Sequence, residues 1–153
     1  MPVAGQPALE QRRAIAKSGV MARPTNALIV EDEPHVRAFV RVLLKESGIT
    51  QTWEAGDGAQ GLAMVAEHHP ELVMLDINLP MMNGIEVLKA VHEQWPELPV
   101  IMLSSQSSMK TVLECVKQGA VAYILKHSPP AEALAMLRDA LDDLADEGAD
   151  SPA

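Results

Sequence analysis

The stretch LVMLD, residues 72–76, is an aliphatic run that ends in a carboxylate. Such runs lack the alternation of a half-buried strand and are typical of parallel strands that are covered on both faces. Three similar runs are found at Ala27–Val30, Val100–Leu103 and Val121–Leu125, and a more polar outer strand is expected at Gln51–Ala55. The sequence therefore predicts a parallel sheet with a buried centre.

Segments with a helical spacing of apolar residues separate these strands. The clearest places Val36, Phe39, Val40, Leu43 and Leu44 on one face of a helix. Helices are expected at about residues 34–46, 58–68, 84–95, 107–118 and 130–145. Alternation of this kind implies right-handed crossovers, and so an α/β fold: a doubly wound, five-stranded parallel sheet with five helices on its two faces.

Start signals support the first turns of three of these helices. Pro34 stands at the expected first helical position of its segment. Asp57 with Gln60, and Asn83 with Glu86, have the spacing of capping boxes, in which each side chain satisfies a free backbone N–H of the first turn.

The length of 153 residues suits one domain. Residues 1–25 are rich in Ala, Gly, Pro and Gln and are expected to form a flexible N-terminal leader, although Met21 is an alternative native start. The domain itself is expected at residues 26–145, and residues 146–153 are expected to form an acidic tail.

Composition excludes several classes of function. The net charge is −9, and all but one of the 21 acids lie after the leader, so direct binding to nucleic acid is not expected. Four aromatic residues cannot build a stacking platform for single-stranded nucleic acid. The single cysteine, Cys115, excludes an intrachain disulfide and fits a reducing cytosol. No apolar run is long enough to span a membrane, so a cytoplasmic protein is expected.

Polar residues follow the buried strands where an aliphatic core would not place them: Glu31 and Asp32, Asp76, Ser104 and Ser105, and Lys126. The carboxyl ends of parallel strands face one crevice, where ligands bind, so these groups should converge. Crowded carboxylates raise the pKa of at least one of them unless a cation holds them, and magnesium prefers such oxygen ligands.

The same residues suit the binding of a phosphoryl group. Lys126 supplies a positive charge for a phosphoryl oxygen, and Ser104 supplies a hydroxyl donor. A carboxylate is a known nucleophile toward phosphorus, and Asp76 stands alone at the end of the expected central strand. Asp76 is therefore the candidate phosphoacceptor.

At this point the chain resembles the receiver domain of two-component response regulators, over about residues 26–145. The motifs that carry the resemblance are LIVEDEP (28–34), EAGDG (54–58), LDINLPMMNG (75–84), MLSS (102–105) and GAVAYILK (119–126). Their order and spacing together are highly specific. The resemblance implies a flavodoxin-like fold with strand order 2-1-3-4-5, the order of chemotaxis receivers.

The resemblance also implies a role for each site residue. Asp76 would accept a phosphoryl group from a histidine kinase or phosphotransfer protein, and Ser104 and Lys126 would bind its oxygens. Mg²⁺ would be held by Asp32, Asp76 and the main-chain carbonyl of Asn78, with Glu31 helping through water. Tyr123 matches the family's switch aromatic, and Asn78 and Gln106 flank the path of the hydrolytic water.

Three positions depart from the common family pattern. Glu31 stands where many receivers have aspartate, and Ser105 replaces a common alanine. His127 follows Lys126 where many receivers have a cis proline, and a cis bond before a non-proline residue costs about 2.5–4 kcal/mol. The loop after the last strand is therefore expected to differ.

The leading interpretation is a stand-alone switch, not an enzyme beyond its own phosphotransfer and dephosphorylation. Its downstream protein partner, or a second copy, would bind helix 107–118, strand 121–125 and helix 130–145. The alternative is a receiver cut from a larger DNA-binding regulator or hybrid kinase. A dehalogenase-type phosphatase would need an acid where Asn78 stands, and a pseudo-receiver usually loses an acid or the lysine.

Four further features have structural interpretations. Cys115 is expected to be half-buried beside an apolar stripe formed by Met109, Val112, Leu113 and Val116. The pair His68-His69 precedes Pro70 and is expected to end a helix, and His35 is expected on the surface. The leucines at 134, 137, 141 and 144 are expected to pack against the core, with a dimer seam as the alternative.

Overall fold

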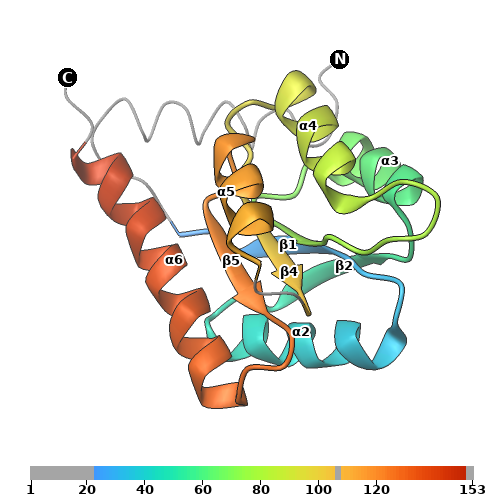
Figure 1. The fold of residues 1–153 in the computed structure, drawn as a ribbon. Coiled ribbons are helices and arrows are strands. Elements are labelled where there is room, and N and C mark those ends of the chain that lie inside the picture. The colour runs from blue at the N-terminus through green and yellow to red at the C-terminus, as the bar shows by residue number, and fades with distance from the viewer. Residues whose placement is uncertain (1–22, 106–107, 151–153) are drawn as a thin grey trace.

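The structure, a computed structural model, describes residues 23–105 and 108–150 (Figure 1). The predicted leader lies outside these ranges except for its last three residues. Strands and helices alternate along the described chain as β1 (Asn26–Val30), α2 (Pro34–Glu46), β2 (Gln51–Ala55), α3 (Gly58–His68), β3 (Val73–Asp76), α4 (Gly84–Gln94), β4 (Val100–Ser104), α5 (Met109–Lys117), β5 (Ala122–Leu125) and α6 (Pro130–Asp150). The predicted alternation is confirmed.

All strands pair in parallel in one sheet, in the order β2-β1-β3-β4-β5, which confirms the predicted order. In the register, Val30 lies opposite Ala55 on one side and Leu75 on the other. Asp76 lies opposite Leu103, so β3 and β4 reach almost the same height. The carboxyl ends of the central strands are therefore level with one another.

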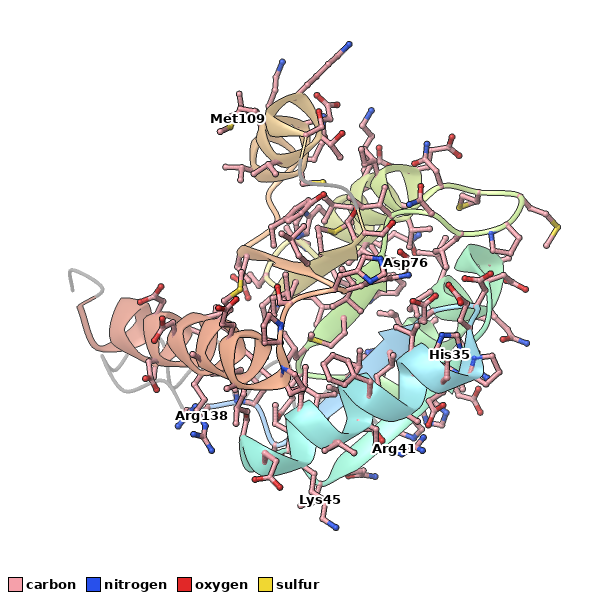
Figure 2. The ribbon with its side chains drawn as sticks, turned by 60° about the horizontal axis from the view of Figure 1, so that its bottom comes forward. His35, Arg41, Lys45, Asp76, Met109 and Arg138 are labelled. Carbon is pink, nitrogen blue, oxygen red and sulfur yellow. The ribbon has the colours of Figure 1, made fainter. Side chains whose placement is uncertain are left out.

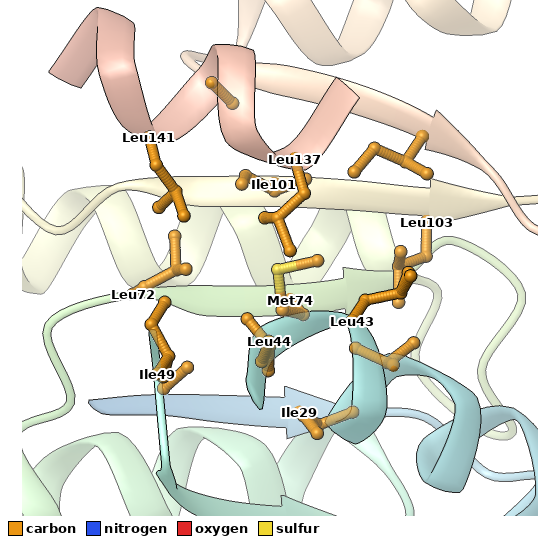
Figure 3. Close-up of a cluster of buried hydrophobic side chains, with 14 of the residues drawn as sticks. Ile29, Leu43, Leu44, Ile49, Leu72, Met74, Ile101, Leu103, Leu137 and Leu141 are labelled. Carbon is orange, nitrogen blue, oxygen red and sulfur yellow. The ribbon is translucent and has the colours of Figure 1, made fainter. Parts of the chain in front are cut away.

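Alternate residues of the central strands enter two separate cores. Helices α2 and α6 cover one face, where Leu43 and Leu44 from α2 and Leu137 and Leu141 from α6 meet Met74 of β3 (Figure 3). Helices α3, α4 and α5 cover the other face (Figure 1). Burial of strands on both faces accounts for their unbroken aliphatic runs, since neither face contacts water.

The capping signals act as predicted. Pro34 begins α2, the Asp57 carboxylate accepts a hydrogen bond from the Gln60 N–H at 2.8 Å, and the Asn83 side chain accepts one from the Glu86 N–H at 3.0 Å. These contacts satisfy N–H groups that lack a partner within the helix. The first turns of α3 and α4 are thereby fixed next to the carboxyl edge of the sheet.

Helix α6 differs from its prediction. It continues to Asp150, so the backbone of residues 146–150, expected as part of an acidic tail, is helical. No proline interrupts this segment before Pro152, and a leucine-rich face already holds the helix against the sheet. That packing confirms the predicted core role of Leu137, Leu141 and Leu144, which are buried, and of Leu134, which is partly buried.

Helix α5 corrects a second expectation. Cys115 is completely buried, not half-buried, and burial raises the pKa of its thiol. Met109, Leu113 and Val116 are instead exposed, and Met109 points away from the body of the protein (Figure 2). An apolar face of α5 is thus open to solvent, which the sequence pattern alone did not distinguish from a core-facing stripe.

The histidine interpretations agree with the structure. Helix α3 ends at His68, and His69 adopts a left-handed conformation with φ of 47° as its C-cap residue. His68 stacks on Trp53 with ring centroids 4.7 Å apart. The side chain of His35 is 78% exposed. Among the described residues, no helix is both long and apolar enough to cross a membrane.

Candidate functional site

Three polar side chains are buried in the described part of the chain, namely Glu31, Asp76 and Ser104, and all three lie at the carboxyl edge of the sheet. Asp76 is the last residue of β3, and Ser104 is the last residue of β4. Glu31 follows β1 directly. Since a buried polar group is costly unless it is paired, their concentration at one edge marks a site and not a random feature of the core.

Lys126 joins two of these groups. Its Nζ lies 2.5 Å from Glu31 Oε1 and 3.0 Å from Asp76 Oδ1, with the lysine side chain 10% exposed. The Asn78 N–H donates a hydrogen bond to the same Asp76 oxygen at 3.2 Å. No cis peptide bond occurs among the described residues, so Lys126 reaches the site with a trans bond to His127.

Glu31, Asp32 and Asp76 could hold a metal ion. Each offers one carboxylate oxygen, and these oxygens lie within 4.8 Å of one another. The second oxygen of Asp76, Oδ2, is buried and has no hydrogen-bond partner among the described residues. A hard divalent cation with oxygen ligands would satisfy such an atom, so the donor set fits magnesium.

The protonation of this site follows from burial. Burial, opposed by Lys126 and assisted by the neighbouring acids Asp32 and Asp76, raises the pKa of Glu31 to about 7. Burial alone would lower the pKa of Lys126, but its hydrogen bonds to Glu31 and Asp76 outweigh this effect and raise the pKa. The expectation of one raised carboxyl pKa is confirmed, although burial contributes more than crowding.

An open cavity of about 470 Å³ adjoins the acidic cluster. Asp32, Asn78, Ser105 and Lys126 contribute to its lining, which also includes His35 at the start of α2 (Figure 2). Asp32, Asn78 and Lys126 thus reach a solvent-accessible space, while Glu31, Asp76 and Ser104 are buried at the carboxyl edge of the sheet. A small phosphorylated donor, or the side chain of a phosphorylated protein, could enter there.

Tyr123 lies away from the acidic cluster. Tyr123 is on β5 opposite Met102, two residues before the position that pairs with Ser104. Its side chain is half-buried and packs against the core below α3, α4 and α5. Gln106 lies outside the described residues. Tyr123 therefore remains a candidate for coupling the site to the α5 side of the domain.

Sequence reasoning missed one residue of the site, Arg37 in α2. Its Nη1 donates a hydrogen bond to the main-chain oxygen of Glu31 at 2.7 Å, and its Nε donates one to Glu54 Oε1 at 3.0 Å. No motif marks this contact, because it joins three segments. The available signal was the pairing of a basic residue on α2 with an acidic residue on the neighbouring outer strand.

The doubly wound fold, with an acidic cluster and a lysine at its carboxyl edge, is that of a receiver domain. Residues 27–138 match the family described as the response regulator receiver domain, and the chain belongs to this family. Receiver domains are phosphorylation-dependent switches that bind Mg²⁺ at an acidic pocket and interact with histidine kinases and downstream effectors.

Similar proteins include several response regulators. The chain is 32% identical to the nitrate/nitrite response regulator protein NarL of Escherichia coli, over 76% of this chain and 55% of that protein. It is 38% identical to the KDP operon transcriptional regulatory protein KdpE of the same species, over 76% and 51%. The chain thus spans about half the length of the curated relatives that it matches.

Solved structures agree with this assignment. A CheY-like receiver domain protein from Methanospirillum hungatei has a TM-score of 0.70 at 28% identity, covering 79% of this chain and 96% of that chain. The receiver domain of NtrX from Brucella abortus has a TM-score of 0.69 at 31% identity, covering 76% and 98%. The predicted membership of the receiver family is confirmed.

Proposed function

We propose that this domain accepts a phosphoryl group on Asp76, in a Mg²⁺-dependent transfer from a histidine kinase or phosphotransfer protein, and thereby switches a protein-binding surface. The observation that carries the proposal is the buried pairing of Lys126 with Asp76 Oδ1, while Asp76 Oδ2 has no hydrogen-bond partner among the described residues. Nothing in an aliphatic core requires a carboxylate at this position.

The chemistry follows from these groups. A carboxylate oxygen of Asp76 attacks phosphorus while the bond from phosphorus to the donor imidazole nitrogen breaks, and that nitrogen keeps the electron pair. Lys126 and the Ser104 hydroxyl would bind the phosphoryl oxygens. Asp32, Asp76 and the Asn78 carbonyl would hold Mg²⁺, with Glu31 helping through water, and the ion would neutralise charge that develops on those oxygens.

Intact-protein mass spectrometry after incubation with acetyl phosphate and Mg²⁺ tests the proposal. We expect the mass of one phosphoryl group to be added to the wild type. Asp32→Ala removes an exposed metal ligand and should abolish both phosphorylation and its Mg²⁺ dependence, because the phosphoryl charge is no longer neutralised. Asp139→Ala, an exposed change on α6, is the control. Equal phosphorylation of Asp32→Ala and the wild type would contradict the assignment.

The lifetime of the phosphorylated state gives a second prediction. Asn78 lines the cavity beside Lys126, and Gln106, by family resemblance, flanks the same water path. Both amides are able to orient a water molecule, so spontaneous dephosphorylation is expected within minutes rather than hours. Asn78→Leu should slow the decay, which is followed by the loss of the added mass after removal of acetyl phosphate. Unchanged or faster decay would refute this role.

The proposed switch couples the site to α5, β5 and α6. A phosphoryl group on Asp76 adds strong acceptor oxygens at the level of Ser104, whose hydroxyl then moves inward. Tyr123, on the strand beside it, would fill the space that this movement leaves. The exposed apolar side chains Met109, Leu113 and Val116 of α5, with Val121 before β5, support this surface as the site for a downstream protein or a second copy.

Removing either switch residue should uncouple binding from phosphorylation. In Ser104→Ala and Tyr123→Ala, we expect Asp76 to remain phosphorylatable, whereas beryllofluoride, a phosphoryl mimic, should no longer change partner affinity or the dimer fraction. Analytical ultracentrifugation with and without beryllofluoride measures the dimer fraction. If both variants respond as the wild type does, this switch does not operate.

A second candidate is a receiver portion of a larger regulator. The length of the relatives favours it, since this chain matches about half of NarL and KdpE. In a DNA-binding regulator or hybrid kinase the receiver chemistry would be the same, and another domain would provide the output. Nucleic acid would not bind the acidic receiver itself. Sequencing the complete gene distinguishes the two. A cytoplasmic location is proposed for both, consistent with the buried, reduced Cys115.

A further inference from the structure

The main chain is held by hydrogen bonds on both sides of Glu31. The Glu31 N–H donates to the Ala55 carbonyl of β2 at 2.9 Å, which is the last backbone hydrogen bond between these two neighbouring segments among the described residues. Strand β1 has ended at Val30, so the Glu31 carbonyl takes its hydrogen bond from a side chain, Arg37 Nη1, at 2.7 Å. Arg37 therefore sets the orientation of the peptide that carries Asp32.

Arg37 is itself fixed by the outer strand. Its Nε donates to Glu54 Oε1 at 3.0 Å, and Arg41 forms an ion pair with the other Glu54 oxygen. The Arg37 side chain is 21% exposed, whereas that of Arg41 is 49% exposed. A guanidinium group has a rigid planar fork, so anchoring Nε on Glu54 also directs Nη1 to its target.

We propose that Arg37, anchored by Glu54, is a positioning residue that sets the affinity of the acidic cluster for a divalent cation. This inference rests on the proposed Mg²⁺ site. Asp32 contributes one oxygen to the cluster and follows the peptide that Arg37 holds. Groups that orient metal ligands typically contribute 10–100-fold to metal affinity.

Electrostatics alone makes the opposite prediction for this residue. Arg37 carries a positive charge close to the cation site, so removing that charge should strengthen cation binding by Coulomb's law. A loss of affinity on removing Arg37 therefore has to arise from geometry. The two explanations therefore predict opposite changes in cation affinity when Arg37 is removed.

The test compares Arg37→Met with Arg41→Met. Both variants remove one arginine that pairs with Glu54, but only Arg37 also contacts the Glu31 carbonyl. The probe is Mn²⁺, which takes the same oxygen ligands as Mg²⁺ and whose unbound form is counted by electron paramagnetic resonance. The titration uses the unphosphorylated full chain, so its readout is independent of phosphotransfer.

We expect Arg37→Met to weaken Mn²⁺ binding about tenfold or more, and Arg41→Met to stay within about twofold of the wild type. In an Asp32→Ala background, Arg37→Met should cause no further loss, because the ligand that it positions is gone. Glu54→Gln, which keeps Arg37 but loosens its anchor, should give an intermediate loss and serves as the second variant if Arg37→Met does not fold.

Equal or tighter Mn²⁺ binding by Arg37→Met and Glu54→Gln would overturn the positioning role. Equal weakening by Arg37→Met and Arg41→Met would also overturn it, since the main-chain contact would then not matter. Failure of the proposed function is distinct from both results, because the wild type would then neither bind Mn²⁺ nor become phosphorylated.

Discussion

Replacing Asp76 with asparagine should abolish phosphorylation of this protein, which is the largest functional effect that we expect. The amide preserves the shape of the side chain, but it has no anionic oxygen to attack phosphorus. Lys126 keeps its ion pair with Glu31, so the local fold should remain. With acetyl phosphate and Mg²⁺, we expect phosphoryl incorporation at least about 100-fold below that of the wild type.

The control for this experiment is Asp139→Asn, which makes the same chemical change on the exposed surface of α6. Treatment with hydroxylamine adds a second check, because it cleaves acyl phosphates and leaves phosphate esters of serine intact. Ser104 and Ser105 lie close enough to Asp76 for this distinction to matter. A hydroxylamine-sensitive phosphoryl group on Asp76→Asn would show that another carboxylate is the acceptor.

Gly84→Ala should have the largest structural effect. A Cβ atom at Gly84 would lie 2.1 Å from the carbonyl oxygen of Asp76 and 2.7 Å from the Cα of Ile77, and both are backbone atoms that cannot rotate away. The Gly84 N–H also donates to the Ile77 carbonyl at 2.7 Å. We expect a loss of about 3 kcal/mol or more in the free energy of unfolding, together with a displaced Asp76 peptide.

Chemical denaturation measures this loss, and Gly56→Ala is the matched control. A Cβ at Gly56 would meet only the ends of two flexible side chains, both at 3.9 Å, and the backbone there needs no left-handed conformation. Replacing such a glycine usually stabilises a protein by about 0.4–1 kcal/mol through the unfolded chain. If Gly84→Ala were as stable as Gly56→Ala, the start of helix α4 would not be packed tightly against the end of strand β3.

Most of the fold and the principal site residues could be predicted from the sequence. The aliphatic run that ends at Asp76 is informative because a strand buried on both faces has no alternation, and the polar residue that follows it stands out. The parallel arrangement then brings Glu31 and Lys126 to the same edge, which the structure shows as ion pairs. The strand order itself came from the family resemblance.

Three features could not be predicted, each for a physical reason. The stripe of α5 is apolar, but only packing decides whether such a stripe or Cys115 faces the core. The end of α6 depends on contacts with the sheet, because the local sequence contains no strong stop before Pro152. The contact between Arg37 and Glu54 joins residues 17 positions apart in a register that only the assembled sheet defines.

The pairing of Lys126 with Glu31 and Asp76 has a consequence for folding. These residues follow or end three different strands, β5, β1 and β3, which become neighbours only through crossovers and long-range pairing. Contacts of such high sequence separation form late, because the chain must first close long loops. Under the proposed function, the ability to acquire a phosphoryl group would therefore arise only after these strands have paired. During refolding, the time at which phosphorylation by acetyl phosphate begins would report when the native topology is complete.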